Sequence, residues 1–173
     1  ILDVGANIGW YSLNFARFAR VKTIHAFEPL PGTFAYLKRH VALNGAGKKI
    51  ITVNKGLSNE EGEKVFYWTS REYGSASMKN IQKRTKIEKV RCRVTTLDRF
   101  MENRHFVVDL IKCDVEGAEL FVFKAGLNVL KRDKPVIFTE MMRKWSAQFG
   151  YHPNDIIALL GAIGYRCFAC AQG

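Results

Sequence analysis

The feature that most constrains this chain is a regular alternation between two kinds of segment. Short apolar runs of strand length are separated by segments in which apolar residues recur every three or four positions, the period of a helix. The expected strands are Ile1–Val4, Thr23–Phe27, Ile50–Val53, Val107–Asp114 and Pro135–Glu140. The expected helices have the apolar faces Tyr11, Phe15, Phe18 and Ala19; Phe34, Leu37 and Val41; Ala118, Phe121, Val122 and Ala125; and Ile156, Leu159, Leu160 and Ile163. Strands that alternate with helices predict an α/β fold, in which a mostly parallel sheet lies between helices on both faces.

The middle of the chain interrupts this alternation. Lys64–Thr69 and Lys89–Val94 predict two antiparallel strands, and in the second of them apolar and basic residues alternate cleanly. The intervening segment, Ser70–Glu88, is polar and basic and predicts a long loop, which in a compact domain is usually functional or mobile. After the last helix, Tyr165–Ala169 predicts a short final strand. We therefore expect an antiparallel β insertion within the parallel framework.

The length of 173 residues fits a single domain over residues 1–173, and no repeat or domain boundary interrupts it. The chain opens at Ile1, inside an apolar run and without a signal peptide, so we expect a fragment that lacks an N-terminal extension and whose last strand is absent or incomplete. No stretch approaches the roughly 18 to 20 apolar residues that span a bilayer. Because Cys113 lies in an apolar run that would bury a free thiol, a reducing, cytoplasmic environment is expected.

The chain is strongly basic, with 27 Lys and Arg against 16 Asp and Glu and a formal net charge of +11. This excess favours acidic partners or surfaces and does not specify the fold. Basic residues are dense between Lys79 and Arg93, which indicates either a phosphate-binding face for a nucleic acid or a solvated loop that docks an anionic acceptor or a peripheral anionic surface. We favour the second interpretation, because no aromatic residues interleave with the run to stack bases.

Acidic residues lie at the carboxyl ends of four of the five expected strands. They are Asp3, Glu28, Asp114 with Glu116, and Glu140. In an open α/β sheet, ligands bind in the crevice at the carboxyl ends of the strands. One such acid alone is better interpreted as a solvated loop residue or as the charge at a helix N-terminus. Four together predict a binding site lined by carboxylates.

The turn after the first strand carries two glycines, Gly5 and Gly9, which allow a tight turn and a close approach to a ligand. Glu28 lies nineteen residues beyond Gly9, where an acid at the end of the second strand accepts the ribose hydroxyls of a nucleoside. The G-x-x-x-G spacing and the adjacent Asp3 disfavour a pyrophosphate, and the chain has no P-loop motif. A carboxylate at this place attracts an ammonium, which S-adenosylmethionine carries beside its cationic sulfonium. The turn therefore predicts this cofactor.

Six longer segments of the chain form a recognisable series. In order they are ILDVGANIGWYS, AFEPLPGTFAYLKRHVALN, KGLSNEEG, TTLDRF, DLIKCDVEGAELFVFKAG and PVIFTE, and they extend from Ile1 to about Tyr165. This series resembles the FkbM-type methyltransferases, which implies S-adenosylmethionine-dependent chemistry on the Rossmann-like class I methyltransferase fold. The cofactor contacts that the resemblance implies are Asp3, Gly5, Asn7 and Gly9 for the methionine part, Glu28 for the ribose, Gly56, Leu57 and Ser58 beside the adenine, and Ala6, Pro29 and Asp114 as further contacts.

The same resemblance implies an acceptor and candidate catalytic residues. We expect O-methylation of a hydroxyl on a sugar, a glycolipid or another small molecule. Asp114 and Glu116 follow the fourth strand, in the position that faces the transferable methyl group, so one of them is expected to orient the acceptor or remove its proton. Glu140 is expected to help bind a hydroxyl. Glu119 is expected only to complement the dipole of the next helix, and His152 is a weaker candidate base.

Three alternatives remain open from the sequence. A metal site at Asp114, Glu116 and Glu140 is not favoured, because these acids already have a cofactor and an acceptor to bind. An RNA-directed methyltransferase would use the basic face, although the D/N-P-P-aromatic motif of amine methylation is missing. A non-catalytic module that binds S-adenosylmethionine would keep only the fold, and the intact glycine turn and Glu28 argue against it. The sequence predicts neither the identity of the acceptor nor the oligomeric state.

Overall fold

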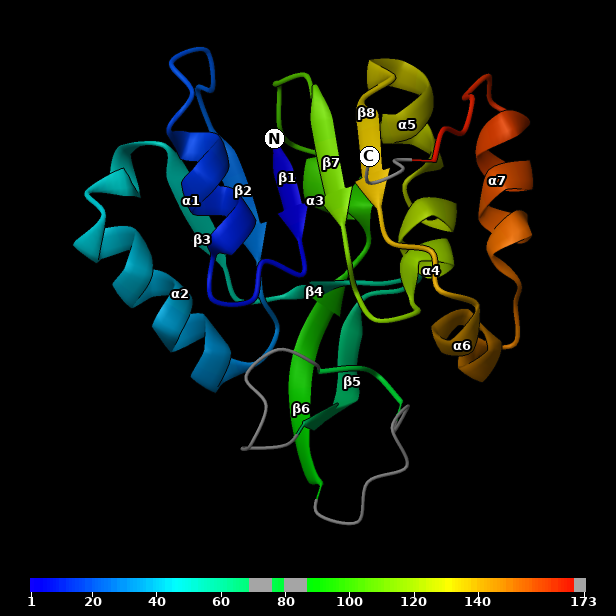
Figure 1. Cartoon of the computed structure of the whole chain (residues 1–173), viewed down its shortest axis with the longest axis horizontal. Helices are drawn as coiled ribbons and strands as arrows, with labels where there is room; N and C mark the ends of the chain where they lie inside the picture. Colours follow the sequence, from blue (N-terminus) through cyan, green and yellow to red (C-terminus); the bar gives the residue numbers. More distant parts are fainter. Residues whose placement is uncertain (69–75, 80–86, 170–173) are drawn as a thin grey trace.

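The computed structural model describes residues 1–68, 76–79 and 87–169, and this part of the chain forms an α/β fold (Figure 1). Within it, five parallel strands make a central sheet in the order β3-β2-β1-β7-β8. They are β1 (Leu2–Val4), β2 (Ile24–Phe27), β3 (Ile50–Val53), β7 (Leu110–Cys113) and β8 (Val136–Thr139). Because β1 lies between β2 and β7, the direction of the strand order reverses there, and a crevice is expected beyond the carboxyl ends of β1 and β7.

The helices in the described part of the chain are mostly short. They are α1 (Trp10–Ala16), α2 (Pro31–Leu43), α3 (Leu97–Met101), α4 (Glu119–Lys124), α5 (Leu127–Asp133), α6 (Arg143–Ser146) and α7 (Pro153–Gly161), with the 3₁₀ helices η1 (Ala46–Lys48) and η2 (Ala147–Phe149). Proline begins both α2 and α7, because a missing N–H costs nothing in the first turn of a helix. None of these helices has the length and apolarity needed to span a bilayer.

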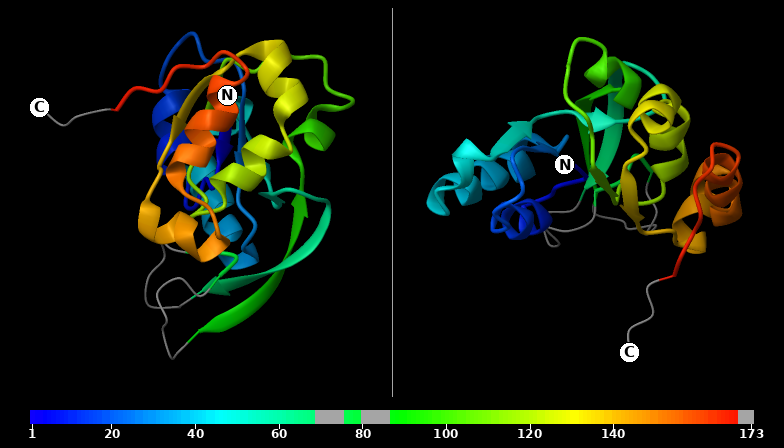
Figure 2. Two further views of the ribbon diagram at one scale, coloured as in Figure 1. Left: turned by 90° about the vertical axis from the view of Figure 1, so that its right-hand side faces the viewer. Right: turned by 90° about the horizontal axis from the view of Figure 1, so that it is seen from above.

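Each face of the sheet has its own hydrophobic core, because successive strand residues point to opposite faces. On one face, Ile24 and Ala26 of β2 pack with Leu37 of α2 and with residues of α1. On the other face, Leu2 and Val4 of β1 pack with residues of α3, α4, α5 and α7. Figure 2, in the view from above, shows α1 and α2 on one side of the sheet and α3, α4 and α5 on the other.

A second, three-stranded sheet extends past the carboxyl ends of the central strands (Figures 1 and 2). It is formed by β4 (Gly56–Leu57), β5 (Gly62–Trp68) and β6 (Glu88–Thr95), and β5 and β6 pair in antiparallel register. Phe66 of β5 and Cys92 of β6 pack on one face of this hairpin, against the start of α2. The hairpin therefore covers the end of the sheet where a ligand is expected.

The structure confirms the predicted α/β fold, including the five parallel strands and the antiparallel insertion. The predicted strand at Tyr165–Ala169 is wrong, since these residues form no strand. Phe168 is 77% exposed, and the Tyr165 hydroxyl donates to the carbonyl of Leu130 instead. The first helix ends at Ala16, so Phe18 lies beyond it and is exposed. Most of the predicted loop 70–88 lies outside the described residues.

Two short helices that the apolar pattern did not predict, α3 and α5, are joined by a cap. Asp98, in the first turn of α3, accepts hydrogen bonds from the backbone N–H groups of Asn128 (3.3 Å) and Val129 (3.0 Å) in the first turn of α5. These N–H groups have no partner within α5 itself, because they belong to its first turn. Asp98 thus connects two helices of the same core.

We predict that Asp98→Ala lowers the free energy of unfolding by about 1 kcal/mol, the usual cost of losing a helix cap. Urea unfolding followed by circular dichroism measures the change. Asp98→Asn is the comparison variant, because its one side-chain oxygen can accept one of the two hydrogen bonds, and a smaller loss of stability is expected. Equal losses in the two variants would contradict the assigned cap.

Candidate functional site

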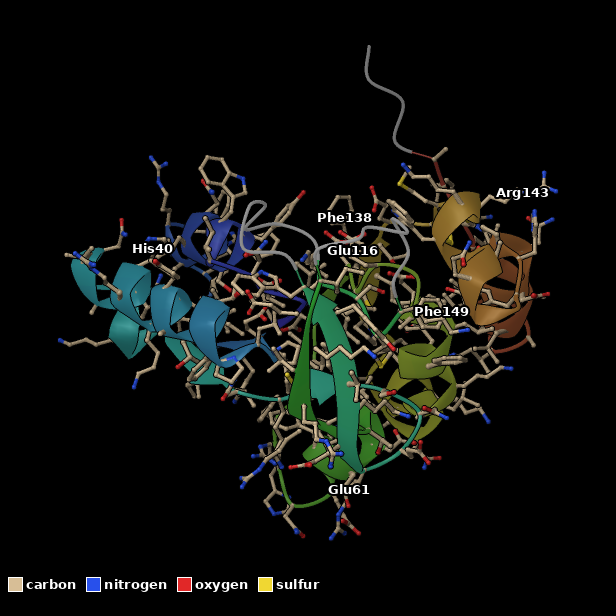
Figure 3. The ribbon with its side chains drawn as sticks, turned by 90° about the horizontal axis from the view of Figure 1, so that it is seen from below. His40, Glu61, Glu116, Phe138, Arg143 and Phe149 are labelled. Atoms are coloured by element: carbon tan, nitrogen blue, oxygen red, sulfur yellow. The ribbon has the colours of Figure 1, made fainter. Side chains whose placement is uncertain are left out.

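A cavity of about 420 Å³ lies at the carboxyl ends of β1, β2 and β7, between them and the β5–β6 hairpin. Its wall comes from the turn after β1, the segment from β2 into α2, the β4–β5 region with residues 76 and 78, and the loop after β7. Its volume lies within the range of about 300 to 1,000 Å³ that is typical of small-molecule sites. Figure 3 looks onto this end of the sheet, with Glu116 between the α1–α2 side and α6.

The turn after β1 passes very close to the loop after β7. Gly5 has a φ of +77°, and a Cβ built on it would lie 2.0 Å from the carbonyl oxygen of Asp114. Gly9 has a φ of +96°, and a Cβ there would lie 2.7 Å from the side chain of Leu37. Only glycine combines this backbone conformation with such close packing. The two glycines are therefore required by the geometry of the turn itself.

The first amide groups of this turn are hydrogen-bonded within the protein. Gly5 and Ala6 both donate to the carbonyl of Phe27, at 3.1 and 2.8 Å. Asn7 donates to Oε2 of Glu28 at 3.1 Å. A turn that cradles phosphate directs free N–H groups at its ligand. These three N–H groups are already used, so this part of the turn is poorly suited to a phosphate.

Two backbone hydrogen bonds fix Glu28 at the end of β2, and its carboxylate can still accept hydrogen bonds from a ligand. Its Oε1 accepts a hydrogen bond from the N–H of Leu30 at 2.9 Å, and its Oε2 accepts the one from Asn7. Each carboxylate oxygen has two lone pairs, so each can accept one further hydrogen bond. Burial raises the pKa of Glu28 to about 7, although both backbone hydrogen bonds act to lower it.

Asp3 lies beneath the cavity and outside its wall. Its carboxylate is fully buried, and Oδ2 accepts a hydrogen bond of 2.6 Å from the hydroxyl of Ser12 in α1. Its Oδ1 lies 3.3 Å from the ammonium of Lys112, the residue that pairs with Asp3 across the β1–β7 ladder. Asp3 therefore fixes α1 and β7 against β1, while Lys112 reaches the cavity wall above it.

The loop after β7 brings Asp114 and Glu116 into the cavity wall. Its backbone is left-handed at two successive residues, with φ of +54° at Glu116 and +96° at Gly117. This conformation costs a non-glycine residue roughly 1 to 2 kcal/mol. A Cβ on Gly117 would lie 2.9 Å from the backbone of Trp145, which precludes any larger residue there. The strained conformation of Glu116 must be held by its surroundings.

Glu119 and Tyr151 hold this loop. Oε1 of Glu119 accepts hydrogen bonds from the N–H groups of Val115 (3.0 Å) and Gly117 (3.1 Å). The Tyr151 hydroxyl donates to the Gly117 carbonyl at 2.9 Å and lies 3.2 Å from Oε2 of Glu119. A phenol has one hydrogen, so a protonated Glu119 satisfies both contacts by donating to the Tyr151 oxygen. Burial raises the pKa of Glu119, in agreement with this arrangement.

Carboxylates around Glu116 affect its ionisation. Burial, together with like-charge repulsion from the neighbouring Asp114 and Glu140, raises the pKa of Glu116 to about 7. Burial also raises the pKa of Glu140, and the negative charge of Asp114 raises it as well. A carboxylate that titrates near neutral pH can accept a proton and release it again, which is what general acid–base chemistry requires.

Comparison with known proteins identifies the family. The family model of the methyltransferase FkbM domain matches residues 3–167. This chain belongs to the FkbM methyltransferase family. Two curated relatives are 30% identical: methyltransferase sdnD of Sordaria araneosa over 152 residues, and methyltransferase 1 of Beauveria bassiana over 146 residues. The alignments cover 72% and 74% of this chain but only 59% and 58% of the relatives, so the chain spans less than two thirds of their length.

Solved structures share the fold of this chain. The crystal structure of methyltransferase FkbM from Methylobacillus flagellatus superposes with a TM-score of 0.58 at 17% identity, covering 94% of this chain and 36% of the other. Precorrin 8w decarboxylase from Methanobacterium thermoautotrophicum superposes with a TM-score of 0.52 at 14% identity, covering 95% and 62%. At these identities the likeness concerns the fold alone.

The FkbM fold brings most of the residues predicted for the site into one cavity wall. Those in the wall are Gly5, Ala6, Asn7, Glu28, Pro29, Gly56, Leu57, Asp114 and Glu116. Those outside the wall are Asp3 and Ser58, which are fully buried, Gly9, and Glu140, which follows β8. The roles predicted for all these residues stay predictions.

Two residues of this site, Lys112 and Tyr151, were missed by the sequence reasoning, and the role of a third, Glu119, was only partly predicted. Lys112 was signalled by its position, as a single charge inside an apolar strand. Glu119 was interpreted as a partner of a helix dipole, but it also accepts two backbone hydrogen bonds from the loop before it. Tyr151 had no signal in the sequence, because its contact with that loop depends on how the chain folds back after β8.

Other candidates from the sequence lie elsewhere. His152 is not in the cavity wall, and its ring Nδ1 accepts a hydrogen bond from the N–H of Asn154 at the start of α7. In the basic run, Lys83, Arg84 and Lys86 lie outside the described residues. Among residues 1–68, 76–79 and 87–169, no three His, Cys, Asp or Glu side chains are placed to hold a metal ion.

We predict that Glu119→Gln keeps the folded loop, because an amide reproduces the hydrogen bonds of a protonated carboxyl. Glu119→Ala leaves two loop N–H groups without an acceptor and should lower the free energy of unfolding by roughly 1 to 3 kcal/mol for each buried group. Urea unfolding of both variants measures the difference. A fall of the same size in Glu119→Gln would contradict the assignment.

The same pair tests the ionisation of Glu119. A carboxyl whose pKa is raised by folding contributes stability that is present at low pH and is lost as the pH rises through its folded value. Glutamine does not titrate, so the stability of Glu119→Gln relative to the wild type should rise as the pH increases above the ordinary glutamate pKa of about 4.3. A difference that is independent of pH would show that Glu119 is not perturbed.

Proposed function

We propose that this FkbM-family protein transfers a methyl group from S-adenosylmethionine to a hydroxyl of a small molecule. The observation that supports this most directly is Glu28, whose two oxygens are each held by a backbone N–H and each keep one lone pair beside the cavity. Two adjacent ribose hydroxyls need such a pair of acceptors. The family implies a methyl donor, and a nucleoside donor matches this site.

The charges of the cavity wall favour a cationic nucleoside. Within the described part of the chain, the wall contains the carboxylates of Glu28, Asp114 and Glu116 and one ammonium, that of Lys112. S-adenosylmethionine has a sulfonium and no phosphate, so it suits a wall in which carboxylates outnumber cations. A dinucleotide would bring a pyrophosphate to a turn whose first three N–H groups are already bonded. On the adenine side, Gly56 and Leu57 supply a close, mainly apolar surface.

Methyl transfer to oxygen is a displacement in which the carbon–sulfur electron pair stays on sulfur and the acceptor oxygen loses its proton. When bound, S-adenosylmethionine supplies a methyl group that is already activated by its sulfonium charge. Glu116 lies in the wall and has a pKa of about 7, so at neutral pH it can take the proton from the acceptor hydroxyl. Asp114 lies in the same wall, and the charges of Asp114 and Glu140 help raise the pKa of Glu116.

A small-molecule acceptor fits this cavity better than a nucleic acid. Lys89, Arg91 and Arg93 of β6 are exposed, whereas Cys92 between them packs on the cavity side of the hairpin with Phe66. Successive strand residues point to opposite faces, so the basic row is turned away from the cavity. A screen of labelled methyl transfer onto sugars, glycolipids and RNA identifies the acceptor class.

We predict that S-adenosylmethionine binds about tenfold more tightly at pH 8 than at pH 6. The ionised form of Glu28 accepts the ribose hydroxyls and attracts the sulfonium, and a group with a pKa of about 7 is mostly protonated at pH 6. Glu116, with a similar pKa, acts in the same direction. Isothermal titration calorimetry in buffers of different ionisation enthalpy also measures the proton released on binding.

Glu28→Gln should weaken binding at pH 8 by roughly 1.5 to 3 kcal/mol, the range for a hydrogen bond to a charged group, and should flatten the pH dependence. Glu63→Gln is the control, because Glu63 is an exposed acid of the hairpin and should leave both quantities unchanged. Wild-type affinity in Glu28→Gln would contradict the ribose assignment.

We predict that Glu116→Gln lowers the methyl-transfer rate at neutral pH by roughly 10² to 10⁴-fold, the usual contribution of a general base. Its affinity for S-adenosylmethionine should change much less, and the rate should recover as the pH rises and the acceptor ionises. Asp114→Asn tests the neighbouring acid in the same assay. Full rates in both variants would leave these acids without a catalytic role.

A further inference from the structure

Lys112 is a buried cation that the proposed reaction does not yet use. Its side chain is 4% exposed, it belongs to β7, and it forms part of the cavity wall. Lysine is almost never buried to this extent unless it is paired. A lysine that only neutralised Asp3 would not need to reach the cavity. The place of Lys112 in the cavity wall therefore indicates a second role, toward a ligand.

The ammonium of Lys112 is only partly satisfied by the protein. Its Nζ donates to the carbonyl of Gly5 at 2.8 Å, and it lies 3.3 Å from Oδ1 of Asp3 and 3.8 Å from Oδ2 of Asp114. The first contact is a hydrogen bond, while the other two are charge contacts with longer distances. The Tyr11 ring, whose centroid lies 5.1 Å from Nζ, adds a cation–π contact but offers no oxygen or nitrogen acceptor. An ammonium has three N–H donors, and a buried donor without an acceptor is costly. Lys112 can therefore accommodate a further acceptor from the cavity.

Asp114 supplies the opposite charge next to Lys112. It is two residues further along the chain, lies in the same wall, and is more exposed, with 40% of its side chain accessible. Asp3 is not available in the same way, because it is fully buried and bonded to Ser12. The wall next to the glycine turn thus presents one cation and one anion to a ligand.

A pair of opposite charges a few ångströms apart is complementary to an α-amino acid zwitterion. The carboxylate of such a group would meet Lys112, and its ammonium would meet Asp114. Among the described residues, the rest of the wall holds the acids Glu28 and Glu116, and only Lys112 offers a positive charge to a carboxylate. The assignment of the ligand carboxylate to Lys112 therefore follows from charge and does not depend on the exact position of the ligand.

We propose that Lys112 is a specificity-determining residue that binds the carboxylate at the methionine end of the cofactor, with Asp114 facing the adjacent ammonium. This inference rests on the proposed function, since it concerns the same cavity. It differs from a structural role, in which Lys112 only neutralises Asp3. A structural role weakens every ligand of the cavity equally, whereas a role in recognition weakens only ligands that carry the carboxylate.

The test is a thermodynamic cycle with two ligands and two proteins, followed by calorimetry at pH 8. S-adenosylhomocysteine has the amino-acid end, and 5′-methylthioadenosine shares its nucleoside but lacks that end. In Lys112→Met, which keeps the length of the side chain without the charge, the Kd of S-adenosylhomocysteine should rise at least tenfold. The Kd of 5′-methylthioadenosine should stay within about twofold. Equal changes for the two ligands would overturn the proposal.

Removing Lys112 alone leaves Asp3 as an uncompensated buried charge, which can impair folding. The double variant Asp3→Asn/Lys112→Met removes both charges and keeps the two side-chain shapes, and the same selective loss is expected in it. An S-adenosylhomocysteine analogue without the carboxylate should bind the wild type and either variant with similar Kd. If the wild type binds S-adenosylhomocysteine no more tightly than 5′-methylthioadenosine, the proposal for Lys112 fails, whereas binding of the nucleoside is still supported. If it binds neither ligand, the proposed function itself fails.

Discussion

The contact between the chain as it leaves β1 and the chain as it leaves β7 is the constraint on which the site depends. At this place a Cβ on Gly5 would overlap the carbonyl oxygen of Asp114, and the N–H of Asp114 donates to the carbonyl of Val4 at 3.1 Å. The Lys112 ammonium joins the same two segments through the carbonyl of Gly5. Since the glycine turn after β1 and the acidic loop after β7, which carries Asp114 and Glu116, meet directly, a shift in either one moves the other.

The acidic loop can keep a strained backbone because the hydrogen bonds that hold it contribute more free energy than the strain costs. Glu116 has a left-handed backbone that costs roughly 1 to 2 kcal/mol, while Glu119 accepts two hydrogen bonds from the same loop in a buried environment. A buried N–H without its acceptor costs a comparable amount for each group, so releasing the loop is less favourable than keeping it. On the other side, the Ser77 hydroxyl donates to the Glu116 carbonyl at 3.1 Å. The loop is thus held by Glu119 in the helix that follows it and by Ser77, which is 39 residues away from Glu116 in the sequence.

The sequence predicted those features that repeat or that lie at fixed spacing. The strand and helix periods were sufficient for the parallel sheet, and the distance from the glycine turn to Glu28 was sufficient to place both in one cavity. The predicted strand at Tyr165–Ala169 failed because strand-like composition does not provide a neighbouring strand to pair with. Helices α3 and α5 were missed because each is only one or two turns long, too short for a clear apolar period.

The contacts that position charges were predictable only in part, and Asp3 is the clearest example. The sequence indicates that a carboxylate beside the turn repels phosphate, but the structure pairs Asp3 with Lys112 and places it outside the cavity wall. The argument against phosphate then rests on other groups: the bonded N–H groups of Gly5 and Ala6, and the acids that outnumber Lys112 in the wall. Lys112 itself could attract an anion, but one ammonium already close to two carboxylates is better matched to a single carboxylate than to a pyrophosphate. The same pairing that keeps Asp3 outside the wall therefore involves Lys112, the one cationic side chain among the described residues of the wall.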